Sequence, residues 1–388
     1  MNKKISLGLA ISLIAIASAV TFILTSFFSL QSFNRTIFGV NEQAKKYNAL
    51  QAVDSYVREN FYGDIDENSI IDGILKGYVS GLDDRYSRYL TADEYIDEKS
   101  DNAGEMTGLG LTLEEDESGY IRIVDIMPDS PVSETAIKPD DFIVAVEGAD
   151  VSEIGFSKSI ESMSGTEGTD ITLTVRRDGV DKNYTLTRRP IEIVTVTGEM
   201  LNNYIGYIKI TGFKQNTSQQ FIDILERLTL NGAKGIIFDV RENGGGLLDA
   251  LEDCLDPLLP EGIIATAEYS DSHTETIVYS DESEINLPVV VLVNGHTASA
   301  AELFAASLKD FGKAELIGSQ TYGKGVMQTT TELVNGGAVV LTIAKYKTAV
   351  SECYDGIGIT PDYVVENENE NIDEQYNKAI EIISGKIN

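Results

Sequence analysis

The chain has 388 residues, of which 42% are apolar, so it is long enough for two or three compact units with buried cores. Its formal net charge of −32 argues against a nucleic-acid partner, because phosphate binding requires clustered lysine and arginine, and against adsorption to an anionic membrane surface. The two cysteines, Cys254 and Cys353, form neither a metal-ligand pattern nor a disulfide framework, and they could form one bridge or stay as free thiols.

The N-terminal segment, residues 1–34, has the composition of a membrane anchor. Lys3 and Lys4 precede an uncharged, largely apolar stretch that is long enough to cross a bilayer. Lysines on this side predict a cytoplasmic N-terminus and an extracytoplasmic remainder. Ala17-Ser18-Ala19 resembles a signal cleavage site, so a cleaved signal and a secreted protein is the alternative. The apolar run continues well past that site, which favours a single-pass protein of the cell membrane.

Residues 43–102 are expected to form an N-terminal helical segment. Leu50, Val53 and Val57 recur at helical spacing, and a second apolar stripe runs through residues 70–79. Two helices that pack on a neighbour account for this pattern.

Residues 103–190 change to a pattern of short strands and turns. The β-branched runs 121–124, 142–146 and 171–175 predict strands, and residues 156–163 predict a short helix between them. A segment of this size predicts a small mixed domain with open sheet edges.

Residues 191–365 alternate between strand and helix patterns, which predicts a layered α/β domain. Buried strands are expected at residues 235–240 and 288–293, each with a helix after it. Residues 366–388 are predicted to be an acidic linker and a short C-terminal helix.

Ser299 stands between the second buried strand and an amphipathic helix. A serine at a helix N-terminus lies beside free backbone N–H groups and the positive end of the helix dipole. Such groups stabilise an oxyanion as it develops on a substrate carbonyl. The alternative interpretation is that Ser299 or Thr297 only caps the helix, which is the commonest role of such residues.

A histidine-based site is disfavoured. His273 and His296 are the only histidines, too few for a histidine zinc site, and neither lies in a metal motif. A Ser-His-Asp triad would need one of them. His296 stands three residues before Ser299 on a tight turn, and His273 stands in a polar segment, so both are expected to be ordinary loop histidines.

Lys324 is flanked by Gly323 and Gly325, which let the backbone pack tightly around it. A lysine in an apolar site loses hydration of its charged form, so its pKa falls and it can act as a neutral base. Gln328, four residues on, could hold the amine in place. The alternatives are an exposed turn lysine and a phosphate-binding loop, but the phosphate-loop pattern is absent.

Residues 239–248 contain three successive glycines between a buried strand and a helix. Glycines allow close approach of backbone to a ligand, and the helix N-terminus offers donors. A dinucleotide site is the alternative, but the spacing lacks its glycine fingerprint.

Together these three segments resemble the C-terminal processing (tail-specific) serine peptidases. The resemblance covers most of the chain beyond the anchor and implies an α/β core of the crotonase-like type, with no metal or cofactor. It implies that Ser299 is the nucleophile, that Lys324 is the general base with Gln328 beside it, and that the N–H groups of Gly246 and Ala300 form the oxyanion hole. In this sequence Gly244 replaces a common proline of the family, which loosens the oxyanion loop.

Residues 103–190 resemble a PDZ domain. The resemblance implies that the loop Gly108-Leu109-Gly110-Leu111 receives the C-terminal carboxylate of a substrate tail. Arg177 resembles an arginine that some relatives use to couple the PDZ domain to the active site. The implied partners are proteins or peptides with apolar C-termini, and a homodimer through the N-terminal helices fits the same family.

Two other classes of function remain open from the sequence. One is a catalytically silent PDZ-containing scaffold that binds tails without cutting them. The other is a carbohydrate or lipid carrier built on the same core, which would need a deep apolar cavity.

Overall fold

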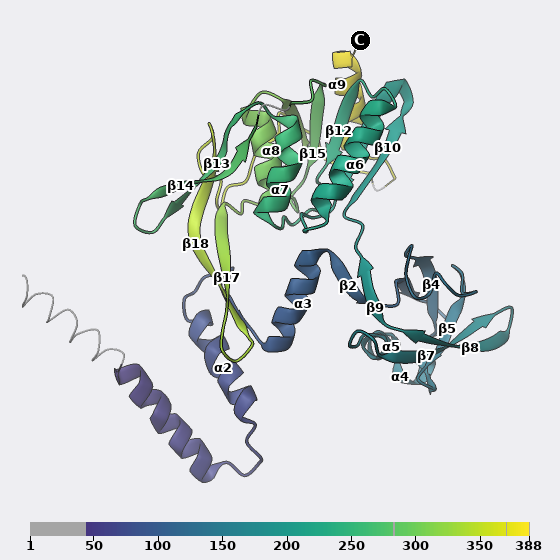
Figure 1. Cartoon of the computed structure of the whole chain (residues 1–388), viewed down its shortest axis with the longest axis vertical. Helices are drawn as coiled ribbons and strands as arrows, with labels where there is room; N and C mark the ends of the chain where they lie inside the picture. Colours follow the sequence, from purple (N-terminus) through teal and green to yellow (C-terminus); the bar gives the residue numbers. More distant parts are fainter. Residues whose placement is uncertain (1–43, 282–283, 370, 388) are drawn as a thin grey trace, which may run out of the picture. The chain divides into compact units, whose positions relative to one another are not determined.

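The computed structural model describes most of the chain, and the predicted anchor lies outside the described part. The described ranges are residues 44–281, 284–369 and 371–387. Within these ranges no helix is long and apolar enough to span a membrane. The described residues divide into two compact units, one up to residue 74 and the other from residue 75 onward (Figure 1).

The first unit is helical where it is described. Residues 44–60 form one helix, and α2 (Glu67–Ser80) begins in this unit and continues into the second. Arg58 joins the two helices, since its guanidinium pairs with Asp54 at 2.9 Å and with Glu67 at 2.5 Å. Several large apolar side chains of this unit are exposed: Tyr47, Leu50, Val53, Tyr56, Phe61, Tyr62, Ile71 and Ile74.

The second unit begins with a short strand and a helix, β1 (Arg88–Leu90) and α3 (Ala92–Ala103). Thr91 caps α3 in a capping box with Glu94, and Gly104 ends the helix in the left-handed conformation at φ 77°. The residues that follow α3 lead into a separate small domain.

That small domain is an open sheet with two short helices. Its sheet has the order β3-β4-β5-β7-β8, with β6 beside β5, and β3 lies at one edge. A two-stranded pair, β2 and β9, stands where the chain enters and leaves the domain. The elements are β2 (Glu105–Gly108), β3 (Leu111–Glu115), β4 (Ile121–Ile126), β5 (Phe142–Val146), β6 (Ala149–Asp150), α4 (Val151–Ile154), α5 (Phe156–Met163), β7 (Asp170–Arg177), β8 (Val180–Thr187) and β9 (Arg189–Glu192).

The rest of the second unit is a layered α/β domain built on a six-stranded sheet. The strand order is β10-β11-β12-β15-β16-β19, parallel except for β10 at the edge. The elements are β10 (Val196–Leu201), η1 (Asn202–Tyr204), β11 (Ile205–Ile210), α6 (Thr217–Leu230), β12 (Gly235–Asp239), α7 (Leu248–Leu255), η2 (Asp256–Leu258), β15 (Val289–Val293), α8 (Ala300–Asp310), β16 (Ala314–Gly318), β19 (Tyr363–Val364) and α9 (Glu374–Ile387).

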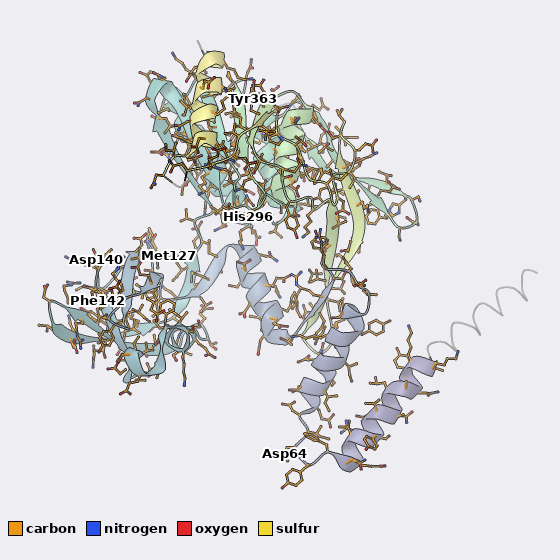
Figure 2. All side chains as sticks on the ribbon, turned by 180° about the vertical axis from the view of Figure 1, so that it is seen from behind. Asp64, Met127, Asp140, Phe142, His296 and Tyr363 are labelled. Carbon is orange, nitrogen blue, oxygen red and sulfur yellow. The ribbon has the colours of Figure 1, made fainter. Side chains whose placement is uncertain are left out.

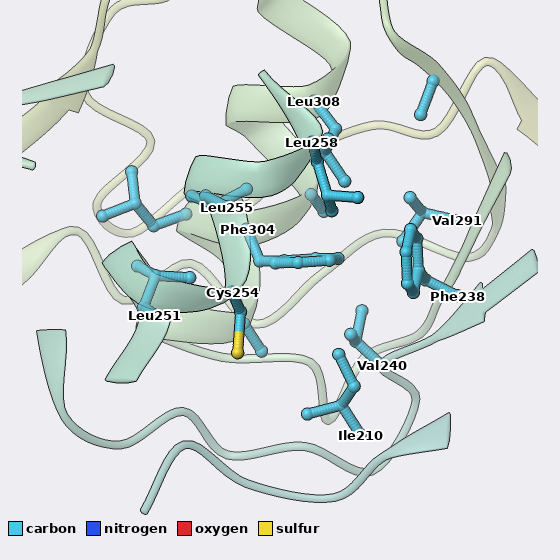
Figure 3. Close-up of a cluster of buried hydrophobic side chains, with 14 of the residues drawn as sticks. Ile210, Phe238, Val240, Leu251, Cys254, Leu255, Leu258, Val291, Phe304 and Leu308 are labelled. Carbon is cyan, nitrogen blue, oxygen red and sulfur yellow. The ribbon is translucent and has the colours of Figure 1, made fainter. Parts of the chain in front are cut away.

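Alternate residues of these strands face two different apolar layers. On one face, side chains such as Phe238 and Val291 pack against α6, α7 and α8, with Phe304 at the centre (Figure 3). On the other face, Ile237 and Val290 pack against α9. Burial on both faces explains why β12 and β15 are apolar along their whole length.

A second, antiparallel sheet contacts the same core. Its order is β1-β18-β13-β14, with β17 also paired to β18. The elements are β13 (Gly262–Tyr269), β14 (Thr274–Ser280), β17 (Val326–Glu332) and β18 (Ala338–Thr348). The pairing of β1 with β18 therefore brings a segment from the start of this unit into the α/β domain.

The neighbouring strands β12 and β15 are parallel and end at Asp239 and Val293. Because the carboxyl ends of parallel strands meet at the same edge of a sheet, the two loops that follow them lie together. Those loops carry the glycine run and Ser299.

Candidate active site

Ser299 stands at the start of α8 in a strained conformation. Its backbone has φ 56° and ψ −121°, in the left-handed half of conformational space that a serine seldom adopts. Its N–H donates to the carboxylate of Glu302 at 2.9 Å. The loop before Ser299 is fixed to the chain just after β12, because the buried Thr297 hydroxyl donates to the carbonyl of Val240 at 2.9 Å. The surrounding structure therefore holds Ser299 in one orientation.

The glycine loop is bound directly to the Ser299 loop. The Ala298 N–H donates to the carbonyl of Asn243 at 2.9 Å, and the buried Asn243 amide donates to the carbonyl of Ile210 at 3.0 Å. Gly245 packs closely against the nucleophile segment: a Cβ there would lie 2.8 Å from the Cβ of Ser299 and 2.9 Å from the N of Ala300. This close approach requires glycine.

Two backbone N–H groups beside Ser299 have no acceptor in the described part of the chain. They belong to Gly246 and Ala300, the two residues predicted to form an oxyanion hole. Gly246 has φ 144°, and its neighbours on either side are fixed by hydrogen bonds between Gly245, Leu247 and the main chain of Phe213. Unpartnered donors that point from rigid backbone are suited to stabilise developing negative charge.

Lys324 lies on the loop between β16 and β17 and is half-buried. Its Nζ stands 4.7 Å from the centroid of the Tyr86 ring, and in the described structure no hydrogen bond joins it to the Ser299 hydroxyl. Burial, together with the positive charges of Arg88 and Arg85, holds the pKa of the Lys324 amine below its usual range. This is the direction that a general base requires.

Glu302 connects the two catalytic candidates, a role that sequence reasoning missed. Its buried carboxylate accepts the N–H of Ser299 at 2.9 Å, of Lys324 at 2.8 Å and of Gly323 at 2.7 Å, and the hydroxyl of Thr321 at 2.6 Å. The available signal was its place three residues after the helix cap, where a glutamate turns back to the cap N–H.

Two tyrosines near Lys324 were also missed. The Tyr346 hydroxyl donates to the Lys324 carbonyl at 2.7 Å, and burial raises the pKa of this phenol. Tyr86 comes from the turn before β1. Neither residue stands near Lys324 in the sequence, so no local pattern could have identified them.

Gln328 lies on β17 and does not contact the lysine amine. Its amide donates to the Thr342 hydroxyl at 3.2 Å and to the carbonyl of Val326 at 3.4 Å. In the described state the predicted support of the amine by Gln328 is not formed.

In the described structure neither histidine is hydrogen-bonded to Ser299. His296 is on a loop of the α/β domain (Figure 2), is 74% exposed, and contacts Glu242 at 2.6 Å. His273 pairs with Asp271 and stacks on Tyr269. Both cysteines are free thiols. Among the described residues, no group of histidine, cysteine and carboxylate side chains could hold a metal ion.

The predicted tail-binding loop lies beside an apolar groove. The N–H groups of Leu109 and Gly110 have no acceptor among the described residues. The loop borders a groove of about 110 Å³ that Leu113, Ile160 and Met163 also line. Leu111 and Leu113 of β3 line the groove, and β3 is an edge strand, so an extended peptide could add to it.

Arg177 lies at the end of β7, and its hydrogen bonds to described residues lie within its own small domain. Its guanidinium pairs with the buried Asp141 at 2.5 Å and donates to the carbonyl of Ala136 at 2.8 Å. Although burial acts to raise it, this ion pair holds the pKa of Asp141 below its ordinary value. Asp140 and Phe142, which flank Asp141, are labelled in Figure 2.

The comparisons with known proteins agree with this geometry. The family model of peptidase family S41 matches residues 204–365, and that of the PDZ domain matches residues 107–187. The carboxy-terminal processing protease CtpA of Bacillus subtilis (strain 168) is 33% identical over 367 residues, which cover 93% of this chain and 77% of that protein. The chain belongs to peptidase family S41.

Other relatives support the same assignment. The carboxyl-terminal-processing protease of Synechocystis sp. is 32% identical over 81% of this chain and 77% of its own length. A protein of known structure from Bacteroides fragilis NCTC 9343 shares the fold, with a TM-score of 0.53 at 18% identity, over 84% of this chain and 99% of that chain. This S41 member is therefore a serine peptidase with a PDZ domain, as the sequence predicted, and proteins are its substrates.

Proposed function

We propose that this peptidase cleaves proteins near their C-termini by acyl transfer, with Ser299 as nucleophile and Lys324 as general base. The neutral Lys324 amine takes the hydroxyl proton of Ser299 as its Oγ bonds to the scissile carbonyl carbon. The N–H groups of Gly246 and Ala300 then hold the oxyanion of the tetrahedral intermediate. Its collapse breaks the C–N bond, and the lysine returns the proton to the leaving amine.

Deacylation repeats the same steps with water. Lys324 takes a proton from a water molecule, hydroxide adds to the acyl carbon, and the Ser299 oxygen leaves with the proton that the lysine returns. Neither half of the reaction calls for a metal or a cofactor. In the state that binds substrate, Gln328 is proposed to turn from Thr342 to hold the amine.

The observation that carries this proposal is the pair of unpartnered N–H groups beside the strained Ser299. A helix cap alone would not need the N–H groups of Gly246 and Ala300 to be left without acceptors in the described structure. The depressed pKa of the half-buried Lys324 adds a base within the same loop cluster.

Recognition of the substrate tail is assigned to the PDZ domain. The N–H groups of Leu109 and Gly110 would donate hydrogen bonds to the terminal carboxylate, and the adjoining groove would take an apolar side chain. Any coupling to the active site through Arg177 would pass through Asp141 and Ala136, the groups that it contacts. Amidation of the substrate C-terminus should weaken binding, and a polar final residue should do the same.

The remaining expectations concern architecture, location and assembly. The parallel sheet covered by helices supports a core of the crotonase-like type. The uncharged stretch after Lys3 and Lys4 supports a single-pass anchor at residues 1–34, with the peptidase outside the cytoplasm. Exposed apolar side chains on residues 44–74 support a homodimer formed through this unit.

The competing function is a silent scaffold that binds tails without cutting them. The observation that favours it is that the Lys324 amine lies over the Tyr86 ring and makes no hydrogen bond to Ser299 in the described structure. The test incubates the protein from about residue 32 onward with an unfolded protein that ends in apolar residues. We expect the parent to cleave it and Ser299→Ala and Lys324→Ala to be inactive, whereas equal cleavage by all three would refute the dyad.

A further inference from the structure

The main chain of Lys324 is held at both of its polar ends. Its N–H donates to Glu302 at 2.8 Å, and its carbonyl accepts the Tyr346 hydroxyl at 2.7 Å. The N–H of Tyr346 also donates to the carbonyl of Gly325 at 3.1 Å. With the backbone fixed, only the rotatable bonds of the lysine side chain can move its amine.

The amine rests on a ring that a different part of the chain supplies. Tyr86 belongs to the turn before β1, and β1 pairs with β18 in the register Arg88 to Val340. The Ser87 hydroxyl fixes this turn, since it accepts the N–H of Thr342 at 3.0 Å and donates to Asp84 at 2.5 Å. The ring of Tyr86 therefore has a defined place over Lys324, 4.7 Å from Nζ.

A second cation also lies close to the Tyr86 ring. The Arg85 guanidinium lies 4.5 Å from the Tyr86 centroid and 5.4 Å from that of Tyr322. The Tyr86 hydroxyl is buried and has no hydrogen-bond partner within the described residues. The ring face, and not the hydroxyl, is thus the part of Tyr86 that Lys324 uses.

We propose that the Tyr86 ring is the resting place of the protonated Lys324 ammonium, and that the amine reaches Ser299 only after it loses its proton. A cation is attracted to an aromatic face, whereas a neutral amine is not. Tyr86 and the Ser299 hydroxyl then compete for one amine, and the turn before β1 sets how often the base is available. Tyr86 is a positioning residue in this scheme.

Several charged groups face this amine from other elements, and they set its proton affinity together with the ring. Burial, Arg88 and Arg85 lower the pKa of Lys324, while Asp84 and Glu302 raise it. Burial raises the pKa of the Tyr86 phenol, as do Tyr322 and Asp355, whereas Arg85 lowers it. Removal of the ring leaves these charges in place, so its effect can be measured separately.

The experiment follows acylation of the full chain by a fluorophosphonate across neutral and alkaline pH. Tyr86→Phe keeps the ring face, so the acid limb of its profile of labelling rate against pH should match that of the parent. Tyr86→Leu removes the face, so the midpoint should move to lower pH by about 0.4 to 1.5 units, with little change on the alkaline plateau. Tyr204→Leu is the matched control, because Lys234 lies over that ring at 5.5 Å outside the site.

An unshifted or raised midpoint for Tyr86→Leu would overturn the inference, and so would a Tyr86→Phe variant that behaves like Tyr86→Leu. Thermal melts show whether each variant is folded, and Tyr86→Met replaces the leucine variant if that one is not. The inference rests on the proposed dyad. If Ser299→Ala is still labelled, the proposed dyad is wrong. If Ser299→Ala is not labelled but Tyr86→Phe and Tyr86→Leu have the same midpoint, only the proposed role of Tyr86 is wrong.

Discussion

The carboxylate of Glu302 holds the backbone of Lys324, whose N–H donates to Oε2 at 2.8 Å. The same oxygen accepts the N–H of Ser299 at 2.9 Å. One buried carboxylate thus fixes the spacing between the proposed nucleophile and base, although the two side chains are not hydrogen-bonded to each other in the described state.

Glu302→Gln should lower both stability and activity. The glutamine NH₂ would face N–H donors in place of an acceptor, so the free energy of unfolding should fall by about 1–3 kcal/mol. Fluorophosphonate labelling of Ser299 should slow by about tenfold or more, because a small misplacement of catalytic groups is costly. Urea unfolding and labelling kinetics measure the two effects.

The matched control for this change is Glu332→Gln on the exposed end of β17. It should leave both measurements unchanged. Normal labelling in a folded Glu302→Gln protein would show that the carboxylate does not position the pair.

The glycine loop should tolerate an added methyl group at Gly244 but not at Gly246. A Cβ on Gly246 would lie 2.0 Å from the carbonyl oxygen of Phe213, at φ 144°, whereas Gly244 has open space around it. Gly246→Ala should therefore displace the donor and reduce kcat by about 10²-fold or more, as loss of one oxyanion-hole donor does. Gly244→Ala should cleave at nearly the parent rate.

Steady-state cleavage of a tailed, unfolded substrate measures both variants. Equal loss in the two would mean that the loop acts through its flexibility and not through the Gly246 N–H.

The activity should rise with pH as the Lys324 amine loses its proton. The pKa of this amine lies below its usual range, so the neutral base is available at lower pH than for an exposed lysine. Arg88→Gln removes a cation that contributes to the shift, so the pKa should rise and the acid limb of kcat/KM should move to higher pH by a few tenths of a unit or more. Arg176→Gln, on the surface of the small domain, should not move it.

The lowered pKa of Lys324 also means that this lysine destabilises the folded state. A lysine whose folded pKa lies below its unfolded value binds its proton less well in the folded state, so stability rises with pH through the interval between the two values. Lys324→Met should remove this part of the pH dependence and stabilise the fold while it abolishes cleavage. Unfolding curves of the parent and of Lys324→Met at neutral and alkaline pH measure this effect. A parent that loses stability relative to Lys324→Met as the pH rises would contradict the prediction.

The sequence predicted the parts of the site that are local. Pattern and spacing placed Ser299 after a buried strand at the start of a helix, and Gly246 after another buried strand, while the family resemblance assigned both to one site. The family resemblance, which the S41 match confirms, supplied the pairing with Lys324.

The rest depended on tertiary contacts that no local pattern records. Tyr86 reaches Lys324 only because β1 pairs with β18, and Tyr346 contacts it from within β18. Gln328 stands at the predicted spacing from the lysine, but the β17–β18 pairing places Thr342 within its reach. Arg177 likewise pairs with Asp141, a contact that its sequence position does not reveal.

The central claim is that Lys324 activates Ser299, and the most direct measurement is the intact mass of the protein after reaction with a fluorophosphonate. The account predicts one added probe on the parent, located at Ser299 by peptide mapping, none on Ser299→Ala, and a rate at least about 10²-fold lower on Lys324→Ala. Labelling at another serine, or an unchanged rate in Lys324→Ala, would contradict it.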